Sequence, residues 1–253
     1  MNSTLNLIEN KPVAEVKVLI AIQARTNSTR FPQKIYQTVG KKMVLDHVID
    51  QAKSAKIYVE RSTHKKVIKC EIAVLHPEND IQLMTTFRHS GAQLIAGSES
   101  DVLSRYVKAI RATKADYIVR LTSDCPLMLD FIISKHINVA VHNDLDYVSN
   151  VEESCRQVAD GFDCEILSSR AIEWLNDNAM TDFEKEHVTV LLRSKKPNNL
   201  KQAFISSKLD SSHIKLSLDT PDDLVNIRKY YHEREHKMNV AQKNFGRKNV
   251  YEL

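Results

Sequence analysis

Runs of apolar residues alternate along this chain with stretches in which apolar residues recur at helical spacing. The first run, 16–22, is interrupted only by Lys17 and is rich in β-branched residues, which predicts a strand buried on both faces, as in a parallel sheet. Similar runs predict strands at 70–76, 92–97, 117–121, 146–150, 160–167 and 214–218. Helical periodicity predicts helices at 44–52, 80–90, 102–110, 130–142, 168–179, 183–193 and 221–237. This alternation is typical of an open α/β sheet.

Three segments do not follow the alternation. Residues 1–14 form a polar lead-in, and residues 238–253 form a basic tail that we expect to lie along the surface or to be partly disordered. Residues 57–69 have no clear period and fit either a hairpin or an inserted loop. The predicted organisation is one domain, 15–237, between two terminal segments.

The composition is that of a soluble globular protein. Of the 253 residues, 42% are hydrophobic and 27% are charged, and the chain is long enough to bury a sizeable core. The 36 basic and 32 acidic residues leave a formal net charge of +4, which is too balanced to indicate a nucleic-acid-binding protein.

The sequence shows neither a cysteine motif for a metal nor a membrane segment. The four cysteines are not at C-x-x-C spacing, which argues against a zinc or redox site. The first residues do not have the pattern of a signal peptide, and no apolar run approaches the roughly 18 residues of a transmembrane helix. We therefore expect a cytoplasmic protein with free thiols and no membrane partner.

A cationic loop follows the first predicted strand. Arg25, Arg30 and Lys34 lie in one short stretch, among small hydroxyl residues such as Ser28. Ligands of open α/β sheets bind outside the carboxyl ends of the strands, so the loop indicates a polyanion site, and a nucleoside triphosphate is the best fit. Because the loop has no glycine, side chains would supply most of the contacts. A solvated basic loop is the alternative that the pattern leaves open.

The stretch I-Q-A-R-x-x-S-x-R-x-P-x-K, which begins at Ile22, resembles the cytidylyltransferases that activate acidic sugars, including the CMP-sialic acid and CMP-Kdo synthetases. It is most similar to the spore coat polysaccharide type of these bacterial enzymes. The resemblance implies a single Rossmann-like nucleotidyltransferase domain with a mostly parallel central sheet and helices on both faces. It also implies CTP as the co-substrate and Mg²⁺ as the cofactor, with the nucleotide bound by Ala24, Arg25, Ser28, Arg30 and Lys34.

Two carboxylates follow predicted strands. Asp124 lies in T-S-D-C-P after the strand at 117–121, and Asp219 follows the alternating strand at 214–218. A carboxylate beside the nucleotide loop suits Mg²⁺, which prefers oxygen ligands and takes one or two of them from protein; a turn aspartate is the alternative for Asp124. The resemblance implies that both residues bind the metal. CMP-sialic acid synthetases often carry a further Asp where this chain has Ser217, so the CMP-Kdo and spore coat types fit better.

The block G-S-E-S-D-V-L-S-R-Y opens the predicted helix at 102–110. On pattern alone, Ser98 and Asp101 have the spacing of a capping box and Arg105 belongs to an exposed ion pair. The same block is similar to one in the spore coat type, where it borders the nucleotide and substrate cleft. The resemblance therefore implies nucleotide contacts from Ser98 and Asp101 and acceptor contacts from Arg105.

Two later blocks are candidates for the acceptor side. In D-G-F-D-C-E-I-L, Asp163 and Glu165 face one side of the predicted strand, which fits an active-site role or an exposed strand face. His187 lies in a block that resembles the family's R-E-H-V-T, with Lys185 in place of Arg; on pattern alone, a histidine at the edge of the core is the alternative. The resemblance implies acceptor contacts from Asp163, Glu165 and His187.

Five blocks in the order of one family span residues 22–224 and indicate a nucleotidyltransferase. We expect a CTP-dependent cytidylyltransferase that transfers CMP to an acidic sugar resembling a nonulosonic acid, releases pyrophosphate and serves surface polysaccharide biosynthesis. Arg25, Lys34 and Asp124 are the expected catalytic residues. The alternatives are a phosphorylated or carboxylated metabolite as the acceptor, a nucleotide-sugar-dependent glycosyltransferase, and a non-enzymatic nucleotide-binding protein. Related synthetases often form homodimers, and the sequence leaves open the oligomeric state and the identity of the acceptor.

Overall fold

A computed structural model describes residues 14–62, 66–151, 156–207 and 209–245, with side chains described through residue 236. Within this part of the chain, seven strands form a central sheet in the order β5-β4-β1-β6-β8-β7-β9. The strands are β1 (Glu15–Gln23), β4 (Val67–Pro77), β5 (Gln93–Gly97), β6 (Tyr117–Thr122), β7 (Tyr147–Ser149), β8 (Glu165–Ser168) and β9 (Gln202–Phe204). Only β8 runs antiparallel to its neighbours, β6 and β7, so the predicted mostly parallel sheet is confirmed.

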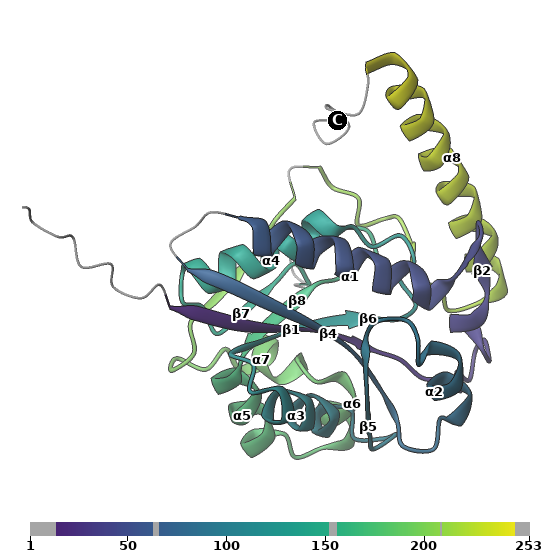
Figure 1. Cartoon of the computed structure of the whole chain (residues 1–253). Helices are drawn as coiled ribbons and strands as arrows, with labels where there is room; N and C mark the ends of the chain where they lie inside the picture. The colour runs from purple at the N-terminus through teal and green to yellow at the C-terminus, as the bar shows by residue number, and fades with distance from the viewer. Residues whose placement is uncertain (1–13, 63–65, 152–155, 208, 246–253) are drawn as a thin grey trace, which may run out of the picture.

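Helices cover both faces of this sheet (Figure 1). One face carries α1 (Val44–Arg61) and α4 (Asp130–His142). The other face carries α3 (Val102–Thr113), α5 (Ser169–Asn178), α6 (Asp182–His187) and α7 (Val190–Lys195). The short α2 (Ile81–Phe87) follows β4, and a single 3-10 turn, η1 (Lys34–Tyr36), follows the loop after β1. The predicted α/β class, with helices on both faces, is therefore confirmed.

The last helix, α8 (Pro221–Phe245), lies apart from both layers. It starts beside a small hairpin formed by β2 (Thr38–Val39) and β3 (Lys42–Met43) and extends away from the rest of the protein (Figure 1). Its first turns bury Leu224 and Ile227 against the hairpin. The helix runs eight residues beyond the end that the sequence predicted at Lys237, because the charged pattern gives no stop signal there.

β1 is buried on both faces, as its apolar run predicted. Ile20 and Ile22 point into the core beneath α1 and α4, while Leu19 and Ala21 point into the core beneath α3 and α5, and all four are fully buried. Side chains of a strand alternate between the faces of a sheet, so a strand covered on both sides needs apolar residues at every position.

Several predicted segments differ from the structure. Residues 214–218 form no strand and make only an isolated bridge, between Lys215 and Asp160. The helix predicted at 183–193 is divided into α6 and α7, which are separated at Val188 and Thr189.

Residues 57–69 form neither a hairpin nor an inserted loop: α1 continues to Arg61 and β4 begins at Val67, while 63–65 lie outside the described residues. Val59 is buried on the same side of α1 as Ala52 and Ala55, so the helical pattern was present but interrupted by the exposed apolar pair Ile57 and Tyr58. The strand predicted at 160–167 begins only at Glu165, where β8 pairs with β6 and β7.

Loops at the carboxyl ends of the central strands are joined by backbone hydrogen bonds. Ala24 N donates to Leu75 O at 2.9 Å, and Ser123 N donates to Gln23 O at 3.1 Å, which connects the ends of β1, β4 and β6. Leu218 N donates to Asp124 O at 2.8 Å and so brings the segment before α8 to the end of β6. Residues from four distant parts of the chain therefore meet at one edge of the sheet.

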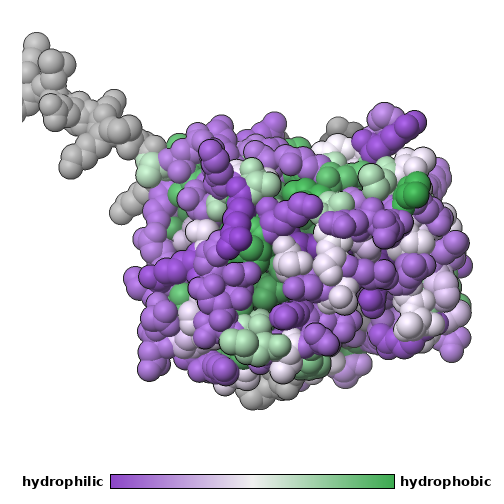
Figure 2. Space-filling model, turned by 90° about the horizontal axis from the view of Figure 1, so that it is seen from below, coloured by the Kyte–Doolittle hydropathy of each residue, from purple (hydrophilic) through white to green (hydrophobic). Residues whose placement is uncertain are grey.

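The surface is largely polar. Hydrophilic residues cover most of the face shown in Figure 2, and hydrophobic residues appear in small groups between them. None of the described helices combines the length and the apolar character that crossing a membrane requires.

Candidate active site

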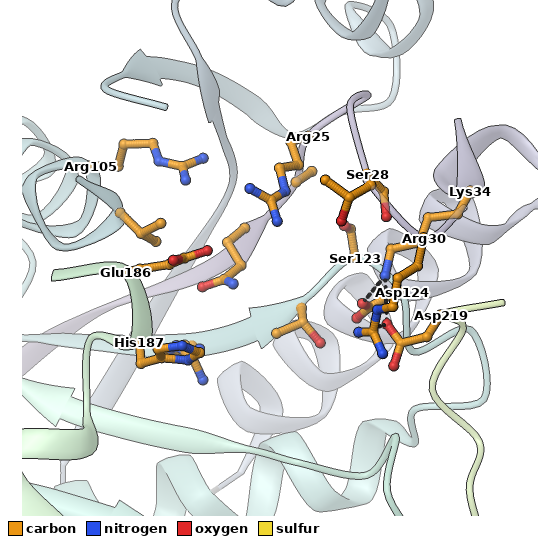
Figure 3. Close-up of a pocket in the computed structure, with 16 residues that line it drawn as sticks. Arg25, Ser28, Arg30, Lys34, Arg105, Ser123, Asp124, Glu186, His187 and Asp219 are labelled. Carbon is orange, nitrogen blue, oxygen red and sulfur yellow. Dashed lines mark hydrogen bonds and ion pairs between the residues drawn. The ribbon is translucent and has the colours of Figure 1, made fainter. Parts of the chain in front are cut away.

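A cavity of about 240 Å³ opens at the carboxyl ends of β1 and β6 (Figure 3). Its walls come from the loop after β1, the first turns of α3, the end of β6, the end of α6 and the segment before α8. The lining residues are Gln23, Ala24, Arg25, Ser28, Thr29, Arg30, Lys34, Val102, Arg105, Arg120, Thr122, Ser123, Asp124, Glu186, His187 and Asp219. All five residues predicted from the opening loop to contact a nucleotide line this cavity, where ligands of open α/β sheets bind.

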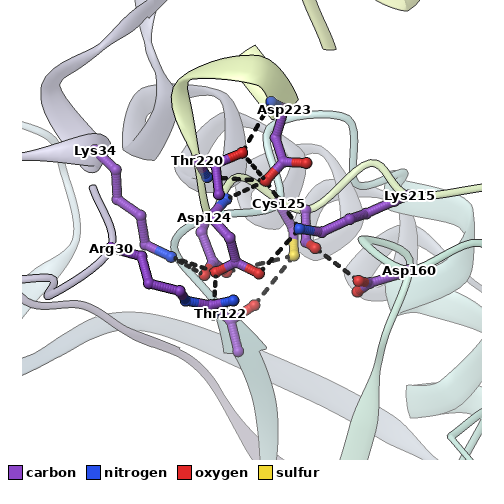
Figure 4. A network of polar contacts seen from close by, with 11 residues as sticks. Arg30, Lys34, Thr122, Asp124, Cys125, Asp160, Lys215, Thr220 and Asp223 are labelled. Atoms are coloured by element: carbon purple, nitrogen blue, oxygen red, sulfur yellow. Dashed lines mark hydrogen bonds and ion pairs between the residues drawn. The ribbon is translucent and has the colours of Figure 1, made fainter. Parts of the chain in front are cut away.

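An ion-pair cluster forms one end of the cavity (Figures 3 and 4). Lys34 Nζ lies 2.6 Å from Asp124 Oδ2 and 3.2 Å from Asp219 Oδ1. Arg30 Nη2 lies 2.8 Å from the same oxygen of Asp219. The structure thus brings together Lys34, Asp124 and Asp219, on which the triphosphate and metal hypothesis depends.

Side chains, rather than glycine, shape the loop that carries Lys34. Asp80, the N-cap of α2, accepts hydrogen bonds from Thr26 N at 2.7 Å and from Thr26 Oγ1 at 2.5 Å. Gln33 adopts a left-handed conformation with φ 57°, and its N–H donates to Thr26 O at 3.1 Å, which closes the loop. The turn after Gln33 then starts η1 at Lys34 and directs its side chain inward.

Asp219 is fixed by the N-terminus of α8, where Figure 4 shows Thr220 and Asp223. Asp223 accepts from Thr220 N at 2.8 Å and from Asp219 N at 3.0 Å, while Thr220 Oγ1 accepts from Asp223 N at 3.3 Å, which forms a capping box at the start of α8. Lys215 Nζ lies 3.2 Å from Asp219 Oδ2. Burial would raise the pKa of Asp219, but Lys34 and Lys215 lower it below its usual value, so this carboxylate is ionised at neutral pH.

Arg105, Glu186 and His187 lie at the opposite end of the cavity (Figure 3). Arg105 is 3% exposed, and within the described residues its side chain has one hydrogen bond, from Nη1 to Leu75 O at 3.3 Å, and no ion pair. Burial lowers the pKa of Arg105. An unpaired buried guanidinium is costly, so this end of the cavity is suited to an anion.

Ser98 and Asp101 do not line the cavity. Asp101 is the N-cap of α3 and accepts from Ser104 N at 2.8 Å, while Ser98 Oγ accepts from Asp101 N at 3.1 Å. The predicted capping residue Ser98 therefore lies three residues before the actual cap, Asp101. Gly97, in the same block, packs against Arg105: a Cβ at position 97 would lie 2.7 Å from Arg105 Cγ.

Asp163 and Glu165 do not share an exposed strand face. Asp163 precedes β8 and pairs with Arg156; burial raises its pKa to about 6, although Arg156 lowers it. Glu165 is 1% exposed and pairs with Arg120 and Arg193, behind the cavity wall. The structure brings neither of the two carboxylates to the cavity surface, because each is paired with arginine outside it.

Several lining residues were not among the predicted contacts. Of these residues, Arg120 on β6 could have been predicted from the sequence, because a charged side chain within a buried strand needs a partner or a ligand. Gln23 is held by Tyr106, whose hydroxyl donates to Gln23 Oε1 at 3.1 Å, and no local pattern links these positions. The remaining ones are Thr29, Val102, Thr122, Ser123 and Glu186.

Asp124 and Asp219 are the residues that could hold a divalent metal. The described part of the chain contains no cluster of three or more His, Cys, Asp or Glu side chains suited to a metal. Two carboxylates that already share the Lys34 ammonium do fit Mg²⁺, which takes one or two protein oxygens and completes its shell with water and phosphate.

The charge of the cavity suits a polyanion. Five cationic side chains line it, Arg25, Arg30, Lys34, Arg105 and Arg120, against three carboxylates, Asp124, Glu186 and Asp219. Neither Arg25 nor Arg105 has an ion-pair partner within the described residues. A triphosphate or an acidic sugar would supply the missing negative charge.

Comparison with known proteins gives the same picture over most of the chain. A family model described as cytidylyltransferase matches residues 19–249. The spore coat polysaccharide biosynthesis protein SpsF of Bacillus subtilis is 28% identical over 231 residues, which cover 88% of this chain and 90% of SpsF.

Two solved structures share the fold. A cytidylyltransferase from Leptospira borgpetersenii superposes with a TM-score of 0.73 at 24% identity, covering 93% of this chain and 99% of that one. A CMP:2-keto-3-deoxy-manno-octonic acid synthetase complexed with CTP superposes with a TM-score of 0.62 at 14% identity, covering 86% of this chain and 99% of that one. Both alignments cover most of this chain and nearly all of the other, so the shared fold extends over most of the chain.

Proposed function

Because this chain belongs to the cytidylyltransferase family and is a nucleotidyltransferase, we propose that it transfers CMP from CTP to an acidic sugar and releases pyrophosphate. A nonulosonic acid or a similar sugar acid of a surface polysaccharide is the proposed acceptor. The name of SpsF refers to polysaccharide biosynthesis, and the CMP:2-keto-3-deoxy-manno-octonic acid synthetase acts on a sugar acid, which supports this class.

The observation that carries the proposal is the contact of one ammonium with two carboxylates at the carboxyl edge of the sheet. Lys34, Asp124 and Asp219 come from separate parts of the chain, yet they converge at the end of a cationic cavity. Such an arrangement costs desolvation energy, and binding a metal-bound triphosphate offsets that cost.

In this proposal, Arg25 and Lys34 bind the triphosphate, with Arg30 and Ser28 in support. Guanidinium groups fit phosphate oxygens as bidentate donors, and the Lys34 ammonium acts as a point charge. Asp124 and Asp219 would hold Mg²⁺, which when bound neutralises charge on the α-phosphate and lowers the pKa of an acceptor hydroxyl. The chain itself aligns the acceptor oxygen with the α-phosphate and excludes water from it.

The other end of the cavity would hold the acceptor. Arg105 supplies an unpaired buried positive charge that favours an anionic acceptor at this end, and His187 and Glu186 supply donors and acceptors for sugar hydroxyls. Ser98 and Asp101 would act indirectly, because they fix the first turn of α3 from which Arg105 projects. We place the enzyme in the cytoplasm, where CTP is available.

A pyrophosphate-release assay tests this proposal. The purified protein is incubated with Mg²⁺, each of CTP, UTP, GTP and ATP, and a panel of acidic sugars, carboxylated metabolites and phosphorylated metabolites. We expect pyrophosphate only with CTP and a sugar acid, and none after chelation of the metal. The product mass should equal that of the acceptor plus CMP minus one water.

Two results would contradict the proposal. Release of a nucleoside mono- or diphosphate from a CMP- or UDP-sugar, without pyrophosphate, would indicate a glycosyltransferase. Thermal stabilisation by CTP and Mg²⁺ without turnover on any acceptor class would indicate a nucleotide-binding protein.

At a CTP concentration 100 times its Kd, binding should stabilise the fold by about 2.7 kcal/mol, which a thermal-shift scan resolves.

A further inference from the structure

The carboxylate of Glu165 is enclosed by four donors, one contact behind the cavity wall. Oε2 accepts from Arg120 Nη1 at 2.7 Å and from Thr189 Oγ1 at 3.1 Å. Oε1 accepts from Arg193 Nη1 at 3.0 Å and from the hydroxyl of Tyr147. A carboxylate offers about four lone-pair sites, so these contacts leave no capacity for a sugar hydroxyl. We call these five residues the Glu165 cluster.

The Glu165 cluster carries a net positive charge toward the cavity. Two guanidinium groups, those of Arg120 and Arg193, oppose one carboxylate. Burial would raise the pKa of Glu165, but Arg120 and Arg193 lower it, so the carboxylate is ionised at neutral pH. Arg120 lines the cavity, and its side chain is 16% exposed. The cluster therefore has one positive charge more than its carboxylate compensates, with the Arg120 guanidinium at the cavity wall.

The same carboxylate fixes the backbone that presents Glu186 and His187. α6 ends at His187, and the next residue, Val188, is buried with φ 54°, a conformation that β-branched residues rarely adopt. Such a residue is retained only where its surroundings hold it. Thr189 is held on the far side of this turn, since it donates to Glu165 and accepts from Arg193 Nη1 at 2.7 Å.

We propose that Arg120 binds the carboxylate of the acceptor and that Glu165 is a positioning residue, which orients both Arg120 and the turn bearing His187 toward it. This inference rests on the proposed function, because it assigns a contact to the acceptor of that reaction. A guanidinium binds a planar carboxylate through two parallel N–H groups, which lysine cannot reproduce. The acceptor is thus a sugar with an ionised carboxyl group, because a neutral sugar would leave the excess positive charge of the Glu165 cluster without a counter-ion.

Kinetics with charged and neutral acceptors test the role of Arg120. The probes are N-acetylneuraminic acid and Kdo, each compared with its methyl ester, and the variants are Arg120→Gln and Arg120→Lys. In Arg120→Gln, we expect the KM for the acid to rise about ten- to a hundredfold, the usual effect of losing a hydrogen bond to a charged group. The KM for CTP should stay within about twofold, the preference for acid over ester should disappear, and Arg120→Lys should restore only part of it.

The role of Glu165 is tested with Glu165→Gln and Thr189→Val. Both variants should raise the KM for the acid while CTP still stabilises the protein in a thermal-shift scan. Thr189→Val removes one donor to Glu165 without leaving a buried charge. It therefore tests the positioning role of Glu165 even if Glu165→Gln fails to fold. The exposed pair Arg111 and Glu173, bonded at 2.9 Å between α3 and α5, provides the matched controls Arg111→Gln and Glu173→Gln, which should leave both KM values unchanged.

The outcomes separate this inference from the proposed function. If the wild-type protein releases no pyrophosphate with CTP and any sugar acid, the proposed function fails and takes the inference with it. If the wild-type protein is active but Arg120→Gln weakens CTP and the acid equally, or keeps its preference for acid over ester, the inference alone is overturned. A normal acceptor KM in Thr189→Val would remove the positioning role of the Glu165 cluster.

Discussion

Lys34 is the side chain that connects the loop after β1 to the segments after β6 and before α8 at the cavity. It is 12% exposed and contacts the carboxylates of Asp124 and Asp219. The two partners depend on it to different degrees. Asp219 also pairs with Arg30 and Lys215, whereas Asp124 has no other cation within the described residues. Loss of Lys34 should therefore leave Asp219 paired and Asp124 exposed to the water of the cavity.

Replacing Lys34 by alanine should abolish turnover without unfolding the protein. We expect pyrophosphate release to fall by at least about a hundredfold, the usual effect of removing one preorganised group that stabilises charge in a transition state. The free energy of unfolding should change by only about 1–2 kcal/mol, because the remaining carboxylate can be hydrated. Pyrophosphate assays and urea unfolding measure the two effects.

Lys42→Ala is the matched control for this change. Lys42 also pairs with an aspartate, Asp50, but on the surface and outside the cavity. Its loss should leave turnover unchanged. If pyrophosphate release survives in Lys34→Ala, Lys34 has no part in the reaction and the assignment of the triphosphate end is wrong.

At the scale of elements, β5 and α3 cooperate to hold Arg105. β5 ends at Gly97, and α3 begins at Val102 after the Asp101 cap. Gly97 leaves just enough space for the Arg105 side chain to pass toward the cavity. Gly97 is required because it packs closely against Arg105, and not because a turn needs its backbone conformation. The sequence therefore could not show why a glycine stands at this position.

Gly97→Ala should destabilise the protein by about 1–3 kcal/mol, because the added Cβ would lie 2.7 Å from Arg105 Cγ and force that side chain to move. In an Arg105→Ala background the overlap is absent, so the same change should cost at least about 1 kcal/mol less. Urea unfolding of the two single variants and the double variant gives this coupling energy. Strictly additive effects would show that the packing of Gly97 against Arg105 has no energetic consequence.

Boundaries between elements were harder to predict than the elements themselves. α1 extends to Arg61 although Ile57 and Tyr58 are exposed, and this irregularity hid the last turns of the helix. β8 starts at Glu165 because pairing with β6 and β7 begins there, which depends on two strands distant in sequence. A local sequence pattern shows the periodicity of a helix or strand. The residue at which a strand begins or ends depends instead on where the neighbouring strands pair with it.

At the scale of the whole molecule, stability depends on pH through buried groups. His136 on α4 is 1% exposed, and burial lowers its pKa to about 4. Its folded-state pKa lies below the unfolded value of about 6.5, so between these values the unfolded chain binds a proton that the folded chain excludes. Stability is therefore lost as the pH falls from about 6.5 toward 4.

His136→Met should reduce this acid sensitivity. At pH 4.5 the excluded proton costs the wild-type protein about 2.5 kcal/mol relative to neutral pH, and the variant should lack that loss. Urea unfolding at pH 7.5 and pH 4.5 measures the difference. His89→Gln, at an exposed position after α2, is the control and should keep the wild-type dependence. Equal losses in His136→Met and the wild-type protein would show that His136 is not the group responsible.

The sequence by itself determined the class of fold, most of the elements and the chemistry of the cavity. A strand buried on both faces requires an uninterrupted apolar run, and 16–22 is such a run. The cations Arg25, Arg30 and Lys34 follow β1 and the carboxylate Asp124 follows β6, and ligands of this class of fold bind at strand ends. Asp219 was also predicted to follow a strand, but 214–218 form only an isolated bridge. These conclusions need only the local pattern of residues along the chain and the general rule that ligands of open α/β sheets bind at the carboxyl ends of the strands.

Only the tertiary structure decided which side chains line the cavity and which lie behind its wall and contact the lining residues. Glu165 had the spacing of an exposed carboxylate, yet it lies buried between Arg120 and Arg193. Arg105 had the pattern of a surface ion pair, yet it is buried and unpaired. The partners of these residues lie tens of residues away along the chain. Ion pairing and burial are set by distances in space, which no local pattern of hydrophobic and polar residues encodes.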